Sequence, residues 1–180
     1  MTSAHTRLHP ATRRWIITAF CCLAALATSA LPSDAAGPPC RAWTGAGADN
    51  KWTTAANWDT GAPNAGDCLL FPQSASTVTN LNDYPDGTAF HEMNFTGGGY
   101  TINGNRVSLT AGLTNSIPEA AVTTINLRLG GAGGVTNTSG WLELVADNLQ
   151  FGETLVQAGG LRAGNSGAFG QNSAPVTLTG

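Results

Sequence analysis

The sequence has few charged residues and almost no clusters of residues that carry chemistry. Only 11% of its 180 residues are charged, with 8 basic side chains against 11 acidic ones and 3 histidines. The basic residues after the N-terminal segment are scattered, at Arg41, Lys51, Arg106, Arg128 and Arg162. Binding to nucleic acid needs a basic stripe or patch. The composition therefore predicts no nucleic-acid partner.

Long apolar stretches are also missing, except for one near the N-terminus. Arg13 and Arg14 precede an apolar run over residues 15–27, and small residues follow it. This is the order of a cleavable secretory signal, and the run is shorter than the ~20 residues that span a bilayer. We predict a signal peptide over residues 1–35, cleaved after its last residue or, as a second choice, after Ala30. The rest of the chain is then exported.

Cysteine is scarce outside this signal. Cys21 and Cys22 belong to it, which leaves Cys40 and Cys68 in the exported part. Two cysteines in an oxidising compartment predict one disulfide. A metal site is the competing hypothesis, but two thiols without clustered histidines do not complete a tetrahedral shell. We expect the disulfide, and no metal or other cofactor.

Helical periodicity is missing from the rest of the chain. Apolar residues recur at every second position, as at Ile125, Leu127 and Leu129, with Asn126 and Arg128 between them. This alternation predicts strands with one buried face. It recurs in four other short segments, at Met93 and Phe95, Val107 and Leu109, Leu142 and Leu144, and Val176 and Leu178.

These strands are short, and glycine and asparagine separate them. Asn103-Gly104 could close a hairpin, but turn residues fall between nearly all the strands. Strands this short bury a core only when they stack as the coils of a solenoid, whose repeats are roughly 20–45 residues long. Glycine and asparagine suit the corners because they adopt positive φ at little cost.

Residues 133–170 carry a series of short motifs at regular positions. The series is Gly133-Gly134-Val135, Leu142-Glu143-Leu144, Asn148 to Gly152, Thr154-Leu155-Val156, Ala158-Gly159-Gly160-Leu161, and Gly164 to Gly170. It resembles the autotransporter-associated β-strand repeat of bacterial passenger domains. Three positions depart from the family pattern: Trp141 replaces a small residue, Gln150 a tyrosine and Leu155 a threonine. Residues 41–71 and 93–115 resemble the segments that open such proteins.

The resemblance implies an all-β fold, a right-handed parallel β-helix (β-solenoid) with an N-terminal Trp-rich cap. The expected domains are the signal peptide, a disulfide-bonded cap over residues 36–75, and β-helix coils over residues 76–180. It also implies display on, or release from, a Gram-negative cell surface, without catalytic or ligand-binding residues. Passengers of this family cross the outer membrane largely unfolded, so we favour general secretory export over the twin-arginine route.

Three tryptophans are the main candidates for a binding site. Exposed rings of Trp43, Trp52 and Trp58 could stack on sugars, as in a carbohydrate-binding module. The alternative, which we favour, is that they cover the first coil, with Trp58 the most enclosed. His91 and Glu92 could act as a base and its orienting group, but neighbouring strand residues point to opposite faces.

Paired carboxylates could indicate a polysaccharide-active β-helix enzyme. The acidic residues are instead spread over separate turns, at Asp83, Asp86, Glu143, Asp147 and Glu153. We therefore expect a non-enzymatic, adhesin-like surface scaffold with an unidentified surface ligand, possibly a polysaccharide. The alternatives are a carbohydrate-binding module and the non-catalytic part of a polysaccharide-active enzyme.

The end of the sequence alternates like the start of another strand, and no charge or proline follows it to blunt an open edge. We expect further repeats to be contiguous with this chain, and membrane attachment only through a C-terminal barrel that these residues do not contain. We also expect the chain to self-associate through its last coil.

Overall fold

The computed structural model describes residues 37–149, 152–170 and 175–179. The predicted signal peptide lies outside these ranges, as do Gln150 and Phe151 of the repeat. Residues 36–180 form a compact unit with their own core. Within the described part of this unit, the chain is all-β apart from one short 3-10 turn, η1 (Ala55–Asn57).

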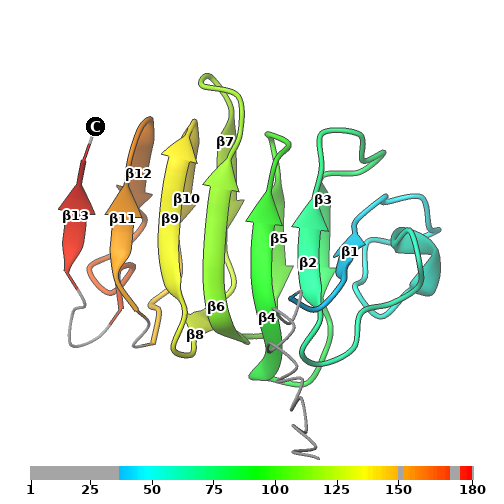
Figure 1. The fold of residues 1–180 in the computed structure, drawn as a ribbon. Coiled ribbons are helices and arrows are strands. Elements are labelled where there is room, and N and C mark those ends of the chain that lie inside the picture. The colour runs from blue at the N-terminus through cyan, green and yellow to red at the C-terminus, as the bar shows by residue number, and fades with distance from the viewer. Residues whose placement is uncertain (1–36, 150–151, 171–174, 180) are drawn as a thin grey trace, which may run out of the picture. The chain divides into compact units, whose positions relative to one another are not determined.

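The strands form two sheets, drawn one behind the other in Figure 1. The front sheet has the order β1 (Cys40–Ala42), β2 (Cys68–Phe71), β4 (Thr88–Phe95), β6 (Val107–Ser116), β9 (Gly134–Ser139), β11 (Thr154–Val156) and β13 (Val176–Leu178), and β8 (Leu129–Gly130) also pairs with β6. The back sheet has the order β3 (Thr79–Asn82), β5 (Thr101–Gly104), β7 (Val122–Ile125), β10 (Trp141–Leu144) and β12 (Gly160–Ala163).

The chain alternates between the sheets and so winds as a parallel β-solenoid of about five turns. In Figure 1 the front strands point upward and successive turns advance from right to left, which is a right-handed winding. The predicted fold is confirmed. Asn103-Gly104 does not close a hairpin: β5 pairs in parallel with β3 and β7, roughly one turn of 20 residues away on either side. The first front strands, β1 and β2, lie inside the range 36–75 predicted as the cap.

Inward side chains of successive turns stack in columns. In one column Phe71 lies flat on Phe95, with ring centroids 4.6 Å apart, because the two residues are partners in neighbouring strands. The column continues with Asn115 and Asn137, both buried. The Asn115 amide donates to Asn137 Oδ1 at 2.7 Å, and Asn137 Nδ2 donates to backbone carbonyls at the next corner. The interior therefore changes from stacked rings to a hydrogen-bonded ladder along the solenoid.

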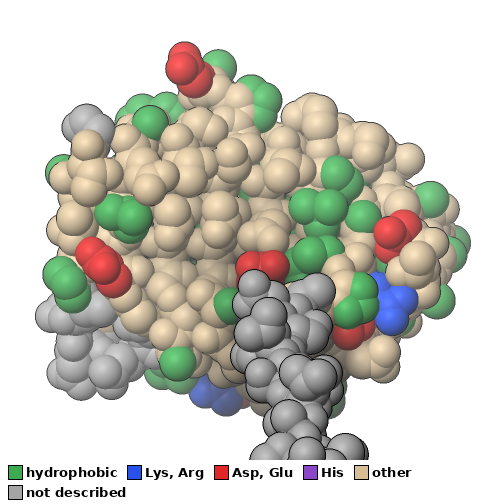
Figure 2. All heavy atoms as spheres, in the orientation of Figure 1, with side chains coloured by type: hydrophobic (Ala, Val, Ile, Leu, Met, Phe, Trp, Pro, Cys, Tyr) green, Lys and Arg blue, Asp and Glu red, His purple; other side chains and the backbone are tan. Residues whose placement is uncertain are grey.

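The outer face of the front sheet is mostly uncharged. Figure 2 shows few acidic or basic side chains over these strands. Its central column contains Thr114 and Thr136 as register partners, and Thr177 further along. Alternation along each strand explains this face, because the residues between the buried ones are small or hydroxylated.

Two corner glycines are required by close backbone contacts. Gly104 has φ of 109°, and a Cβ there would lie 2.2 Å from the carbonyl oxygen of Asn82. Gly159 has φ of 74°, and a Cβ there would lie 2.0 Å from the carbonyl oxygen of Gly140. A side chain at either position would be strained twice, by its conformation and by the neighbouring turn.

Candidate functional site: the cap and its disulfide

The segment between β1 and β2 folds back over the first turn and bonds to the outer edge of β1. Asp59 N donates to the Ala42 carbonyl at 2.9 Å, and Ala42 N donates to Asp59 Oδ1 at 3.0 Å. The amides of Thr44 and Gly45 both donate to the carbonyl of Asn57. An open strand edge invites pairing with another chain, and here this segment, which we call the cap (residues 44–60), occupies it.

The same cap also closes the back sheet at this end. Trp52 N donates to the Leu81 carbonyl at 3.0 Å, and Leu81 N donates to the Asn50 carbonyl at 2.8 Å. Beside them, the amide and hydroxyl of Thr53 donate to the two carboxylate oxygens of Asp83. Asp83 is thus a structural acceptor that ties the cap to the end of β3.

Trp43 and the two cap tryptophans, Trp52 and Trp58, form a buried aromatic cluster. Trp43 and Trp52 are 0% exposed and Trp58 is 4% exposed. Trp58 meets the other two edge to face, at centroid distances of 5.2 and 6.2 Å. Each indole N–H donates inside the protein: Trp43 to the Thr77 carbonyl, Trp52 to Asn80 Oδ1 and Trp58 to the Trp52 carbonyl.

This burial matters for the carbohydrate-binding hypothesis, which needs exposed rings. None of the three rings offers a face to solvent, and each indole donor is already used. The expectation that Trp58 is the most enclosed is wrong, because the other two lie deeper. Trp58 is nearest the surface since it packs under the cap loop, whereas Trp52 contacts Phe71 and Phe90 of the first turns.

Asn57 and Asp49 hold the cap loop in shape. Asn57 is fully buried; its Oδ1 accepts from Gly47 N at 2.8 Å, and its Nδ2 donates to the Asp49 and Lys51 carbonyls. The Asp49 carboxylate accepts hydrogen bonds from the Lys51 amide and the Thr54 hydroxyl, which lower its pKa below the ordinary value.

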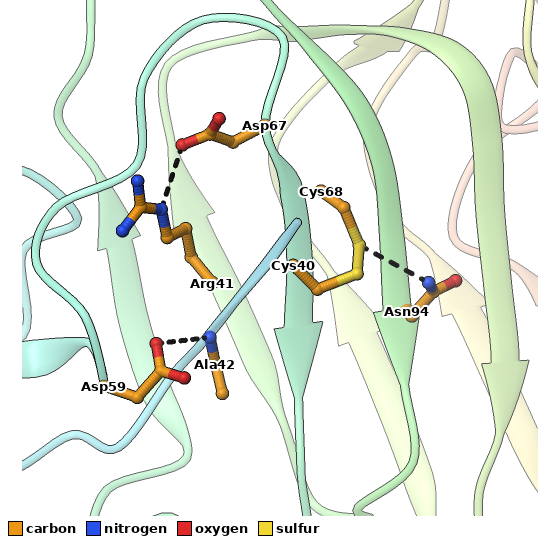
Figure 3. The surroundings of a disulfide bond; sticks show 7 residues. All are labelled: Cys40, Arg41, Ala42, Asp59, Asp67, Cys68 and Asn94. Atoms are coloured by element: carbon orange, nitrogen blue, oxygen red, sulfur yellow. Dashed lines mark hydrogen bonds and ion pairs between the residues drawn. A yellow bond between two sulfur atoms is a disulfide. The ribbon is translucent and has the colours of Figure 1, made fainter. Parts of the chain in front are cut away.

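A disulfide joins Cys40 and Cys68, as predicted, between directly paired residues of β1 and β2 whose Cα atoms are 4.2 Å apart. Figure 3 shows it beside the ion pair of Arg41 and Asp67, with Nε and Oδ2 3.1 Å apart, and with the Asn94 amide 3.7 Å from Cys68 Sγ. Disulfide and ion pair attach β1 to the same edge of β2. Together they anchor the strand on which the cap is built.

Ligand atoms gather in the described part of the chain at one place. Cys40, Cys68 and Glu92 face outward on three neighbouring strands, with their ligand atoms within 4.8 Å of one another. A metal would be bound by thiolates, and here the two sulfurs are bonded to each other. In this oxidised form the group is therefore a disulfide with a neighbouring carboxylate.

The other candidate groups are dispersed. His91 lies at a register irregularity between β4 and β6, with Nδ1 3.3 Å from the Thr110 hydroxyl. Asp86 pairs with Arg106 at 3.1 Å. Glu143 and Glu153 accept from threonine hydroxyls of neighbouring strands. These carboxylates act as surface acceptors between turns, and the structure does not bring them together.

Sequence reasoning missed the aromatic residue that is exposed. Trp141 is 37% exposed on the outside of β10, and its ring lies under the Arg162 guanidinium at 4.6 Å. A Cβ on Gly160 would lie 2.2 Å from this ring, so the ring covers Gly160. The signal was present, because Leu142 and Leu144 point inward and alternation places Trp141 outward.

Motif residues of the segment 133–170 take defined positions in consecutive turns. Asn148 is buried; its Oδ1 accepts from Leu129 N, and its Nδ2 donates to the Ala168 carbonyl, both at 2.7 Å. Leu142 and Leu144 are fully buried. Each of these motif residues forms part of the core or of a contact between turns.

No protein-family model, curated protein or solved structure matches this chain. Among the described residues, no helix is long and apolar enough to cross a membrane.

Proposed function

We propose that this protein is a non-enzymatic, exported β-solenoid scaffold of the autotransporter-passenger type, presented at or beyond the cell surface. The observation that carries the proposal is the use of the segment 133–170. Its motif residues build corners, columns and bridges between turns. This is what a scaffold repeat requires, since each coil is stabilised by its neighbours.

The distribution of reactive groups supports a scaffold over an enzyme. A general base needs a partner and a substrate position within hydrogen-bond reach. His91 lies beside a threonine hydroxyl on an open sheet face, and Asp83 is held by Thr53 of the cap. The largest described pocket feature lies elsewhere, at the C-terminal end, and is lined by Val156, Gln157, Ala158, Gly159 and Leu178.

Export is supported by two independent features. The N-terminal segment has the composition of a secretory signal, and the Cys40–Cys68 disulfide is of a kind that persists in oxidising compartments. The bond closes the chain around the cap, with 28 residues of sequence separation. Oxidation after export would then complete the N-terminal end of the scaffold.

The export part is tested by expressing the full chain in a Gram-negative host. We expect processed protein outside the cytoplasm, with a new N-terminus near residue 36 and no thiol free for alkylation after denaturation without reductant. An unprocessed, fully alkylated protein in the cytoplasm would refute export while leaving the scaffold proposal standing.

The scaffold part is tested by placing residues 36–180 upstream of an autotransporter barrel and measuring protease-accessible, folded passenger on intact cells. Gly159→Ala is expected to reduce display severalfold, because its Cβ meets the carbonyl of Gly140. Gly66→Ala is the matched control: Gly66 also has positive φ, at 88°, but nothing lies within 4 Å of its Cβ position. Equal display of both variants would contradict a role of the repeat corner in passenger folding.

A further inference from the structure

The C-terminal end of the solenoid presents two sheet edges that no other described strand pairs with, those of β12 and β13. Val176 is 45% exposed and Leu178 is 74% exposed, although both continue buried columns of the interior. Leu178 also lines a pocket of about 290 Å³ with the corner from Val156 to Gly159. The end therefore exposes core-type side chains beside unpaired backbone groups, a combination that favours strand pairing with another chain.

We infer that this end binds the same end of a second copy of the chain, in a closed twofold dimer. Head-to-tail stacking is blocked, because the cap already bonds to the outer edges of β1 and β3 at the other end. A contact between two identical ends is isologous and stops at two copies. The inference is independent of the proposed export function.

The half-turn offset of the two edges selects the orientation of this dimer. β13 belongs to the turn after β12, so the front sheet extends half a turn beyond the back sheet (Figure 1). If β13 paired with β13 of the second copy, the back sheets would be left one strand short. If β13 pairs with β12 of the second copy, both sheets close at the ordinary spacing of about 4.8 Å. The twofold axis then runs along the strands, and both new pairings are antiparallel.

Side-chain direction sets the register. Leu178 points toward the interior of its own end, and so does Leu161 on β12, whose neighbour in β10 is the buried Leu142. With Thr177 opposite Arg162 of the second copy, inward residues meet inward residues and Leu178 lies against Leu161. Opposite residues in an antiparallel pair are about 4.5–5.5 Å apart, which joins the two cores.

Charge complementarity supports the same pairing. Glu153 accepts a hydrogen bond from the Thr177 hydroxyl, so its carboxylate lies over β13. Arg162 points outward from β12 over Trp141. Each end thus carries an acid on the front sheet and a base on the back sheet. The proposed axis exchanges the sheets and brings Glu153 near Arg162 of the second copy twice.

Sedimentation velocity on residues 36–180, over a wide range of concentration, tests the inference. We expect a monomer–dimer equilibrium without larger species. Leu178→Asp should weaken dimerisation about 100-fold, because it places a charge in both copies of the joined core. Ala89→Asp is the matched control on an exposed position of β4, and should leave the dimer unchanged.

Charge reversal distinguishes the proposed orientation from other dimers. Arg162→Glu and Glu153→Arg should each weaken the dimer about tenfold, and the double variant should restore it. Circular dichroism and unfolding midpoints of the monomers check that each variant is folded. A wild-type monomer at all concentrations, an open-ended polymer, or a dimer indifferent to Leu178→Asp would overturn the inference. Failure of the double variant to restore the dimer would overturn the pairing of β13 with β12.

Discussion

The two ends of the solenoid solve the same problem in opposite ways. At the N-terminal end, the cap bonds to the outer edges of β1 and β3 and buries Trp43, Trp52 and Trp58 over the first turn. At the C-terminal end, Leu178 remains mostly exposed beside β12 and β13. A solenoid turn is complete only when something covers its open side. The difference shows that the inner columns are equally apolar at both ends, and that coverage decides whether they are buried.

The largest expected effect is the removal of an indole from the capped end. Trp52→Ala should lower the free energy of unfolding by about 3–5 kcal/mol, because it empties a fully buried site and leaves Asn80 Oδ1 without its donor. Urea unfolding of residues 36–180 measures this loss. Trp141→Ala removes the same group from the open half and should cost about 1 kcal/mol, through its contact with Arg162. Equal losses would show that the cap cluster contributes no more than a surface ring.

The disulfide should have the next largest effect. Replacing Cys40 and Cys68 together by serine is expected to lower the free energy of unfolding by about 3 kcal/mol, from the chain entropy of the loop that it closes. The same loss should follow when wild-type protein is unfolded with a reductant present. A reductant that lowers the midpoint of the double variant as well would point to a cause other than this bond.

The asparagine ladder is a feature of the middle turns, and its loss should cost less. Asn137→Ala removes the acceptor of the Asn115 amide and a donor to the Ala158 carbonyl, so we expect about 1–3 kcal/mol. Asn126→Ala is the matched control, since Asn126 is exposed and bonds only to Asn103 Oδ1 in the described contacts. Thermal unfolding should separate the two variants clearly, and similar midpoints would contradict a stabilising role for the buried ladder.

Alkaline pH should give the smallest effect, and it should begin at the capped end. Burial raises the pKa of Tyr100 above its ordinary value of 10.0, and burial followed by the charges of Asp83 and Asp67 raises the pKa of Tyr84. A raised folded-state pKa means that stability is complete below pH 10 and declines as pH rises beyond it. Both hydroxyls donate to carbonyls of the first turns, at Pro72 and Pro63.

Hydrogen exchange measured at increasing alkaline pH tests this order. Protection of β2 and β3 should fall before protection of β9 and β10, after correction for the intrinsic rate. Tyr100→Phe should make the unfolding midpoint less sensitive to pH above 10, at the loss of one hydrogen bond. Uniform loss of protection along the solenoid would show that the tyrosines do not set the alkaline limit.

Much of the fold was predictable because it depends on local pattern. Alternation identified inward residues such as Leu142, Leu144 and Ile125, and glycine and asparagine marked the corners. The pairing of Cys40 with Cys68 was also predictable, since few cysteines were left to choose from. The candidate binding residues were less predictable: a tryptophan in a cap and one on a sheet face have similar sequence surroundings. Only packing distinguishes the buried Trp52 from the exposed Trp141.

The sequence by itself determined that the chain forms short strands with one apolar face and that turns separate them, because both follow from residues a few positions apart. It did not decide between Asn103-Gly104 as a hairpin and as a solenoid corner. That depended on pairing between residues of successive turns, such as Asn82 with Gly104. Nor did it decide that Val176 and Leu178, with the same alternation as buried pairs, are exposed. Burial in a solenoid is a property of the next layer, and only the tertiary structure shows where a layer ends.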